Sequence, residues 1–367
     1  MSSVRDNPSW SFHRSSISLA VSVNQLTFYP TDTWSPNGST VANASMIGMQ
    51  PLGLFIDQND SIYVNDGAQN RTVIWSSGQQ NATRILHHGT GQSYGIFAQE
   101  NGDIYVDNGR NNRTVDKWSG NASTGVSVMP VDGICYTLFI DINETLYCAE
   151  ADNHRIVAMS LRNNACAPVT VAGNGTCSSE WETLCFPVSI FVDINLNLYV
   201  ADSGNGRIQR FAPNDARGTT VATTRSLGPI ASFIPFGVSI DVNGYLFLVD
   251  RRAHGIFLSG PNENRCVVGC SGNNGSEPHQ FTSPSHVAFD SQGNMFVLDQ
   301  GNDRLQNFSI KRGPRRKSHS GARAFRSFVS SSCIQSTKTL FEPIMESEWN
   351  HCCLHECDWW NATWPVC

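Results

Sequence analysis

The chain has 367 residues, including 12 Cys, and a formal net charge of −6 at pH 7. Only 15% of residues are charged, against about 25% in an ordinary soluble protein, whereas Asn occurs 32 times. A hydrophobic fraction of 40% excludes wholesale disorder, and the sequence has no apolar run near the roughly 20 residues of a transmembrane helix.

The first 33 residues precede any regular pattern. An apolar stretch at Ile17–Val23 follows Arg14, but it is at the short end of what a secretion signal needs. We expect residues 1–33 to be an N-terminal segment that is either a degenerate signal or the remnant of a longer one, and we favour the second interpretation.

One segment then recurs six times as an apolar strand, a polar turn, a second strand, a polar loop and a third strand. The copies are Pro51–Trp75, Tyr94–Trp118, Tyr136–Ser160, Pro187–Phe211, Pro235–Ser259 and Pro284–Phe308. In most copies an acid stands three residues after a central Tyr or Phe, and an Arg follows five residues later. Agreement at several fixed offsets indicates a repeat architecture.

A fourth strand-like string follows each of the first five copies, but none follows the sixth. Instead, a similar string at residues 39–42 precedes the first copy. Four antiparallel strands repeated six times predict an all-β fold, a six-bladed β-propeller over residues 34–310. We expect the N-terminal strand to complete the last blade and close the ring, because an open ring would expose strand edges.

The fourth copy, FPVSIFVDINLNLYVADSGNGRIQRF at 186–211, and the sixth, at 283–308, resemble the NHL repeat. The resemblance implies a six-bladed NHL propeller. It also implies a binding platform for proteins, RNA or ligands, since that is the common use of NHL propellers. Fold alone assigns no activity, so function has to be argued from a site.

The acids and arginines of the repeat are predicted to be structural, because a catalytic group is needed once and these recur in nearly every blade. The acids should accept backbone N–H groups after the second strand, and the arginines should pair with them. The predicted structural set is Asp66, Arg71, Arg113, Glu150, Arg155, Asp202, Arg207, Asp250, Asp299 and Arg304. The fifth copy departs from the pattern at residues 251–255 (RRAHG), which is either a specificity feature or, as we favour, sequence drift.

Asn and Cys usage predicts a secreted or extracellular glycoprotein. Twelve Asn-x-Ser/Thr sequons occur, and the glycosylation candidates are Asn37, Asn43, Asn81, Asn121, Asn174 and Asn274. Cys177 with Cys185 and Cys266 with Cys270 are the plausible disulfide pairs, while a Cys135–Cys148 pair would have to bridge neighbouring strands. The complete connectivity stays open.

The repeat pattern ends near residue 310. Residues 311–367 hold eight Lys or Arg against five Asp or Glu, so residues 1–310 carry −9, which argues against nucleic-acid binding. We expect a basic linker followed by a poorly ordered Cys-rich tail. Its HCCLHEC string at 351–357 leaves a zinc site, a disulfide knot or an incorrectly predicted exon as alternatives.

The sequence gives little support to an enzymatic function. Peptide-amidating lyases, which resemble NHL proteins, hold zinc with three His that open first strands. Here His286 lies one residue after the position that such a His would occupy. Because successive side chains of a strand alternate between its two faces, His286 should point away from the axis. Calcium-dependent lactonases of propeller form need several Asp, Glu or Asn side chains that point toward the axis. In this chain the acids that end the first strands could supply carboxylates, but a role in the hairpin turns explains them more simply. They are Asp57, Asp141, Asp193, Asp241 and Asp290.

We therefore predict an extracellular, non-catalytic NHL propeller that binds a protein or glycan through a face of blade loops. No catalytic, metal or cofactor residue is predicted, nor a transmembrane segment, and the oligomeric state is left open. The alternative is a metal-dependent enzyme at the axial mouth, either a peptide-amidating lyase-like protein or a lactonase-like hydrolase.

Overall fold

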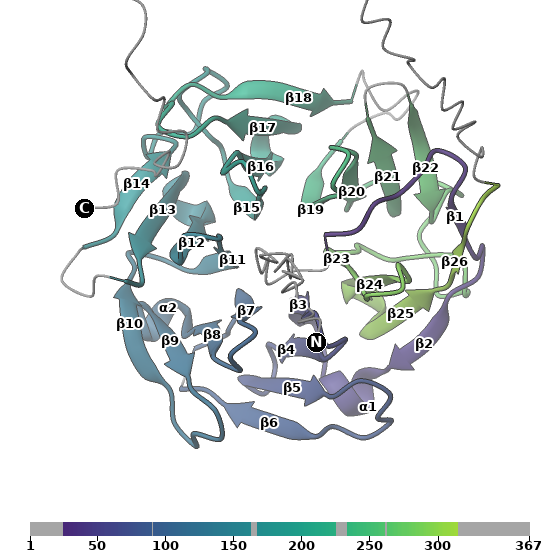
Figure 1. Cartoon of the computed structure of the whole chain (residues 1–367), viewed down its shortest axis with the longest axis horizontal. Helices are drawn as coiled ribbons and strands as arrows, with labels where there is room; N and C mark the ends of the chain where they lie inside the picture. The colour runs from purple at the N-terminus through teal and green to yellow at the C-terminus, as the bar shows by residue number, and fades with distance from the viewer. Residues whose placement is uncertain (1–24, 90, 163–166, 225–232, 261–262, 315–367) are drawn as a thin grey trace, which may run out of the picture. The chain divides into compact units, whose positions relative to one another are not determined.

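The computed structural model describes residues 25–89, 91–162, 167–224, 233–260 and 263–314. Six four-stranded antiparallel sheets surround a common axis as the blades of a propeller (Figure 1). This confirms the predicted all-β, six-bladed class. The predictions for residues 1–24, for most of the basic linker and for the Cys-rich tail fall outside the described residues.

In each blade the strands run in sequence order from the axis outward, except for the last strand of blade 6. Blades 1 to 3 consist of β3 (Pro51–Ile56), β4 (Ile62–Asp66), β5 (Arg71–Trp75) and β6 (Arg84–His87); β7 (Ile96–Ala98), β8 (Ile104–Asp107), β9 (Thr114–Trp118) and β10 (Val126–Pro130); and β11 (Cys135–Ile140), β12 (Thr145–Glu150), β13 (Arg155–Ser160) and β14 (Val169–Ala172).

Blades 4 to 6 consist of β15 (Pro187–Val192), β16 (Leu198–Asp202), β17 (Arg207–Phe211) and β18 (Thr219–Thr223); β19 (Pro235–Ile240), β20 (Leu246–Asp250), β21 (Gly255–Ser259) and β22 (Asn264–Val268); and β23 (His286–Phe289), β24 (Met295–Asp299), β25 (Arg304–Phe308) and β2 (Ser39–Ala42). Short helical turns separate some strands: α1 (Ala44–Ile47), α2 (Gly109–Asn112), η1 (Ala151–Asn153), η2 (Ser203–Asn205) and η3 (Gln300–Asn302).

The two ends of the described chain close the ring. Strand β2 pairs antiparallel with β25, with Ser39 opposite Asn307 and Ala42 opposite Leu305. The predicted closure by residues 39–42 is thereby confirmed. A further short sheet joins β1 (Thr33–Trp34) to β26 (Ile310–Lys311), so the first and last described segments pair twice.

Residues before β1 also belong to the packed propeller. The Phe28 ring lies 5.0 to 5.2 Å from the rings of Trp34, Phe247 and Phe289, which brings together blades 5 and 6. The backbone N–H of Phe28 donates to Asp241 Oδ2 at 3.1 Å. The compact unit thus begins before residue 34 and extends to Gly313.

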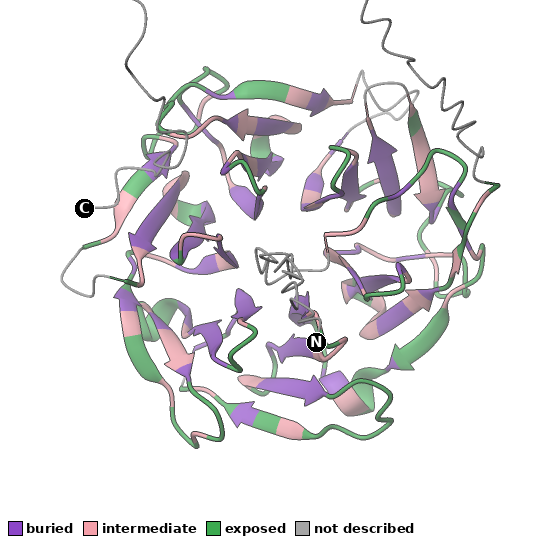
Figure 2. Ribbon diagram, in the orientation of Figure 1, coloured by how far each residue is buried: buried purple, intermediate pink, exposed green. Residues whose placement is uncertain are grey.

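Burial falls from the axis to the rim (Figure 2). Every residue of β12 and β20 is buried, since a second strand has strands on both edges and a neighbouring blade on both faces. The outermost strands alternate or are largely exposed, as in β10 and β2. This gradient leaves the first strands and their adjoining loops to shape whatever site lies on the axis.

Candidate functional site

Four of the predicted acid–arginine pairs form buried ion pairs at the ends of second strands. The Arg Nε to carboxylate oxygen distances are 2.6 to 2.9 Å in Arg71–Asp66, Arg155–Glu150, Arg207–Asp202 and Arg304–Asp299. The arginines also bind the loop that enters the blade: Arg207 donates to the carbonyls of Ser179, Glu180 and Thr183. These groups use their hydrogen-bonding capacity inside the fold, which is a structural role.

Blades 2 and 5 depart from this arrangement. In blade 2 the loop is one residue longer, so Arg113 lies in the left-handed turn that ends α2 and forms no ion pair with a described residue. The buried Asp107 there accepts the backbone N–H of Cys135 at 3.2 Å. In blade 5 Gly255 replaces the arginine, and Asp250 Oδ2 is buried without a hydrogen-bond partner among the described residues.

This difference predicts opposite effects of one substitution in two blades. Burial raises the pKa of Asp250 above its ordinary value, so the wild type loses stability as pH rises through that pKa. We expect Asp250→Asn to be more stable than the wild type by about 1 kcal/mol at neutral pH, with the gain vanishing in acid. Urea unfolding at several pH values measures this. Asp202→Asn, which weakens a pair with Arg207, should be destabilised at neutral pH; a gain there would contradict the argument.

The turn acids that might have held calcium are occupied by their own hairpins. Asp57 Oδ1 accepts the N–H groups of Asn59 and Ser61, and its Oδ2 accepts the hydroxyl of Tyr63 at 2.9 Å. Asp141 makes the same contacts in blade 3, including Tyr147 at 2.9 Å. Within the part of the chain that the structure describes, no three His, Cys, Asp or Glu gather as a metal site.

Three disulfides lie within the described chain. Cys135–Cys148 joins β11 to β12, Cys177–Cys185 closes the loop before β15, and Cys266–Cys270 joins β22 to the turn that follows it; the Cα–Cα distances are 5.1, 4.3 and 5.7 Å. All six glycosylation candidates are exposed, and Asn43 also caps α1 by accepting the Ser45 N–H. No helix among the described residues is long and apolar enough to cross a membrane.

The axis opens into a cavity on the face that carries the loops after the second strands. We call this cavity the axial mouth; its volume is about 250 Å³. All six blades or their entry loops contribute side chains. The lining is Gln50, Leu52, Gln92, Tyr94, Tyr136, Phe186, Val188, Phe236, Arg251, His286 and Gln300.

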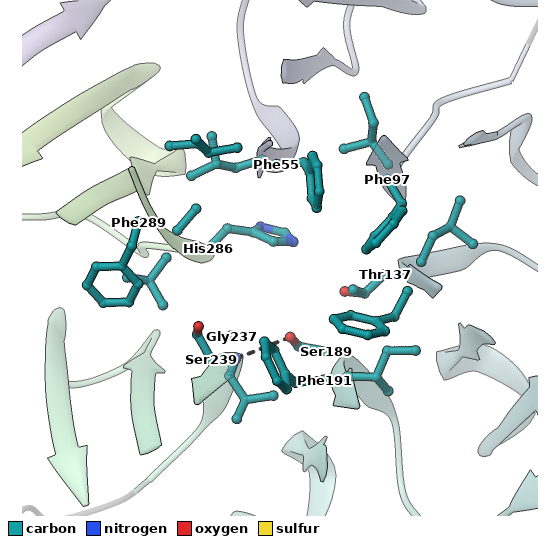
Figure 3. Close-up of a pocket in the computed structure, with 18 residues that line it drawn as sticks. Phe55, Phe97, Thr137, Ser189, Phe191, Gly237, Ser239, His286 and Phe289 are labelled. Carbon is teal, nitrogen blue, oxygen red and sulfur yellow. Dashed lines mark hydrogen bonds between the residues drawn. The ribbon is translucent and has the colours of Figure 1, made fainter. Parts of the chain in front are cut away.

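Beneath the mouth the axis is filled by a crescent of Phe side chains from blades 1 to 4. The successive ring centroids of Phe55, Phe97, Phe139 and Phe191 are 4.7, 5.3 and 5.0 Å apart. Blades 5 and 6 place Ser239 and Ala288 at the same register. The smaller side chains help leave a second cavity of about 90 Å³, which we call the deep cavity (Figure 3).

His286 lines both cavities, and the expectation that it faces away from the axis is wrong. Figure 3 shows its ring projecting from blade 6 into the space bounded by the Phe crescent. Its strand partner is Leu298, just before the repeat acid, which is the register of Gly53, Ser189 and Gly237 in other blades. In those blades a register shift follows the Pro. Regular alternation counted from the Pro therefore assigns this position to the wrong face of the strand, and its side chain faces the axis.

Aromatic rings form one wall of the mouth. Tyr94 and Tyr136 lie 4.6 Å apart, and Tyr136 and Phe186 lie 5.3 Å apart, measured between ring centroids. Burial raises the pKa of Tyr136 to about 12 and raises that of Tyr94, so both hydroxyls remain protonated at neutral pH. This wall can stack against an apolar group and donate hydrogen bonds at its edge.

Polar groups form the opposite side. The Arg251 guanidinium lies 4.4 Å from the ring centre of Phe236, and burial lowers its pKa without removing its charge at neutral pH. Burial also lowers the pKa of His286 to about 4, so its imidazole is neutral. His286 Nδ1 and Gln300 Oε1 are buried and lack hydrogen-bond partners among the described residues.

Sequence reasoning identified the RRAHG departure but not its place at the mouth, and it missed the Phe crescent. The sequence did contain a signal for the crescent. In the first four copies a Phe stands two residues before the turn acid, or before Gln99 that replaces this acid in the second copy, whereas the last two copies have no Phe there. The aromatic wall had a weaker one, since Tyr94 and Tyr136 open their copies. The convergence of these positions follows only from the ring.

The family model of the NHL repeat matches residues 184–211, which span β15 to β17. The chain is therefore a six-bladed β-propeller that contains an NHL repeat. A search of curated proteins gives no significant match.

Solved structures with the same fold have low sequence identity to this chain. A protein of unknown function from Bacteroides thetaiotaomicron is 14% identical, with a TM-score of 0.61 and 76% of each chain covered. Virginiamycin B lyase from Staphylococcus aureus is 14% identical (TM-score 0.51; 71% of this chain and 81% of that chain). A presumed gluconolactonase is 12% identical (TM-score 0.56; 80% and 97%). The likeness shows a shared propeller fold.

Proposed function

We propose that this protein is an extracellular, non-catalytic binding propeller, and that its partner, a protein or glycan, engages the loops around the axial mouth. The observation that carries the proposal is the composition of the mouth. Aromatic rings, amides and one cation line a preformed cavity, which is the usual character of a recognition site. The surrounding loops rest on a rigid scaffold that the pairing of β2 with β25 closes.

The protonation states at the mouth favour binding over proton transfer. General acid–base catalysis works best when the pKa of the acting group lies near the operating pH. Here the pKa of His286 is lowered to about 4 and that of Tyr136 is raised to about 12. Such groups keep one protonation state around neutral pH and serve as fixed hydrogen-bonding groups.

The extracellular part of the proposal rests on the three disulfides and on the exposed sequons. Disulfides persist in oxidising compartments, and two of the three close short surface loops. All six of the glycosylation candidates stand on exposed positions where an oligosaccharide could be attached. Glycans would also supply solubility that the low charge content does not.

The test uses the full chain, produced by secretion from eukaryotic cells. Peptide mapping without reduction should recover Cys135–Cys148, Cys177–Cys185 and Cys266–Cys270 as disulfides, with glycans on exposed sequons. Metal analysis should find no stoichiometric zinc or calcium, and a chelator should leave thermal unfolding unchanged. Free thiols with unmodified Asn would refute the compartment, and stoichiometric metal would refute the non-catalytic role.

A second candidate is an enzyme at the mouth, a metal-dependent lyase or hydrolase. The position of His286, with an unpartnered nitrogen at the cavity, favours it, but the lining of the mouth adds no Asp, Glu, Cys or second His to hold a metal. Solved propellers of similar fold include a lyase and a presumed gluconolactonase. The metal analysis separates the two candidates, because this alternative requires a bound ion that a His286→Ala variant loses.

A further inference from the structure

The six blades do not contribute equally to the axial mouth. The residue after the repeat acid, or after Asn108 that stands in its place in blade 2, is small in blades 1 to 4, where it is Gly67, Gly109, Ala151 and Ser203. It is Arg251 in blade 5 and Gln300 in blade 6, and both side chains line the mouth. The RRAHG departure therefore places a long cation on the axis where blades 1 to 4 leave space.

The deep layer has the same asymmetry. Blades 1 to 4 supply the Phe crescent, while blades 5 and 6 supply Ser239 and Ala288. His286 also comes from blade 6 and takes the register where other blades have Gly, Ser or Thr. The Phe crescent and the Tyr94–Tyr136 wall thus come from blades 1 to 4, whereas the cation and the imidazole at the axis come from blades 5 and 6.

The polar side has unused hydrogen-bonding capacity. No carboxylate among the described residues lies within ion-pair distance of Arg251, although its side chain is half-buried. A partly desolvated cation is costly unless an anion compensates for the lost water. The unpartnered His286 Nδ1 and Gln300 Oε1 lie at the same cavity. The His nitrogen is an N–H donor in one tautomer, and the Gln300 side chain presents an N–H donor there when its amide is turned by half a rotation.

We infer that the axial mouth binds an aromatic carboxylate, with the ring against Tyr94 and Tyr136 and the carboxylate on Arg251, His286 and Gln300. The inference rests on the proposed binding function and names the chemical group recognised at the centre of the face. A cavity of about 250 Å³ is larger than the roughly 150 Å³ cavities that hold benzene. Either a free aryl acid or the C-terminal aromatic residue of a peptide could provide this group.

Calorimetric titration of the full secreted protein tests the inference with four probes. Benzoate represents a free aryl acid and N-acetylphenylalanine a peptide terminus. Benzamide and N-acetylphenylalaninamide are the matched compounds without charge. We expect at least one acid to bind with a Kd near or below about 1 mM and each amide to bind at least tenfold more weakly than its acid. The tighter acid identifies the source.

Two variants assign the carboxylate contact. Arg251→Gln removes the charge and should weaken binding of the acid at least tenfold, while Arg251→Lys should restore part of it. Arg252→Gln removes an exposed charge from the same loop and should leave the affinity within about twofold. Unchanged thermal unfolding of all three shows that the fold is retained.

Three results would overturn the inference: no binding of either acid to folded protein at about 10 mM, equal binding of acids and amides, or equal losses in Arg251→Gln and Arg252→Gln. None of them bears on the disulfides, glycans or metal content that test the proposed function. A failure of the ligand class is therefore distinguishable from a failure of the binding propeller as a whole.

Discussion

Replacing Phe28 by Ala should lower the free energy of unfolding by about 3–5 kcal/mol, the range for truncating a buried Phe. The ring is 4% exposed and contacts aromatic rings from blades 5 and 6 as well as Trp34 of β1. Its loss would leave a cavity where the N-terminal segment holds the last two blades together. The expected result is a large decrease in the midpoint of urea unfolding, measured by near-ultraviolet circular dichroism.

A matched control is Trp181→Ala, which removes a larger aromatic side chain that is 66% exposed on the loop before β15. Its unfolding free energy should change by no more than about 0.5 kcal/mol. Phe28→Leu should fall between the wild type and Phe28→Ala. If Phe28→Ala and Trp181→Ala shifted the midpoint equally, the N-terminal segment would not be part of the cooperative unit.

The second large effect is expected for Arg207→Ala, again a loss of about 3–5 kcal/mol. Arg207 Nε lies 2.7 Å from Asp202 Oδ2, and the Asp202 side chain is fully buried. Removing the guanidinium leaves a buried carboxylate without its cation and frees three carbonyls of the Cys177–Cys185 loop. Desolvation of that charge dominates the cost. Thermal and urea unfolding of the purified variant measure it.

Arg217→Ala provides the comparison, because Arg217 is 76% exposed and its pair with Glu182 spans 3.2 Å in solvent. Exposed pairs contribute no more than about 1 kcal/mol, so little change is expected. The double variant Arg207→Ala with Asp202→Ala should recover part of the loss, since no charge is then left buried. A double variant less stable than Arg207→Ala alone would contradict the electrostatic argument.

The repeat acids show how far the sequence could predict structural roles. Pairing of Asp66, Asp202 and Asp299 with an Arg five residues later was predictable, because the two ends of a tight loop face each other across a strand pair. Arg113 was predicted to have the same structural role because it stands at the same offset in its copy. The loop of blade 2 has one more residue before its strand, so Arg113 ends in a left-handed turn. Residue offsets in the sequence do not show that a loop has gained a residue.

The mouth was predictable only in part. The anomaly at 251–255 was visible because five other copies define what is normal there. His286 was misassigned because counting from Pro284 assumes regular alternation, and the other first strands carry register shifts. The meeting of Arg251, His286 and Gln300 with Tyr94 and Tyr136 joins residues from four blades, and no local pattern encodes that proximity.

The sequence by itself determined the repeat, the number of blades and the strand that closes the ring, because each blade repeats the same local alternation of apolar and polar residues. Only the tertiary structure decided which side chains face the axis and what they form together. The physical reason is that three strands of every blade lie within one copy of the repeat, as in Pro51–Trp75, so their pattern can be read locally. The axial mouth, in contrast, results from the inward ends of all six blades meeting around one line.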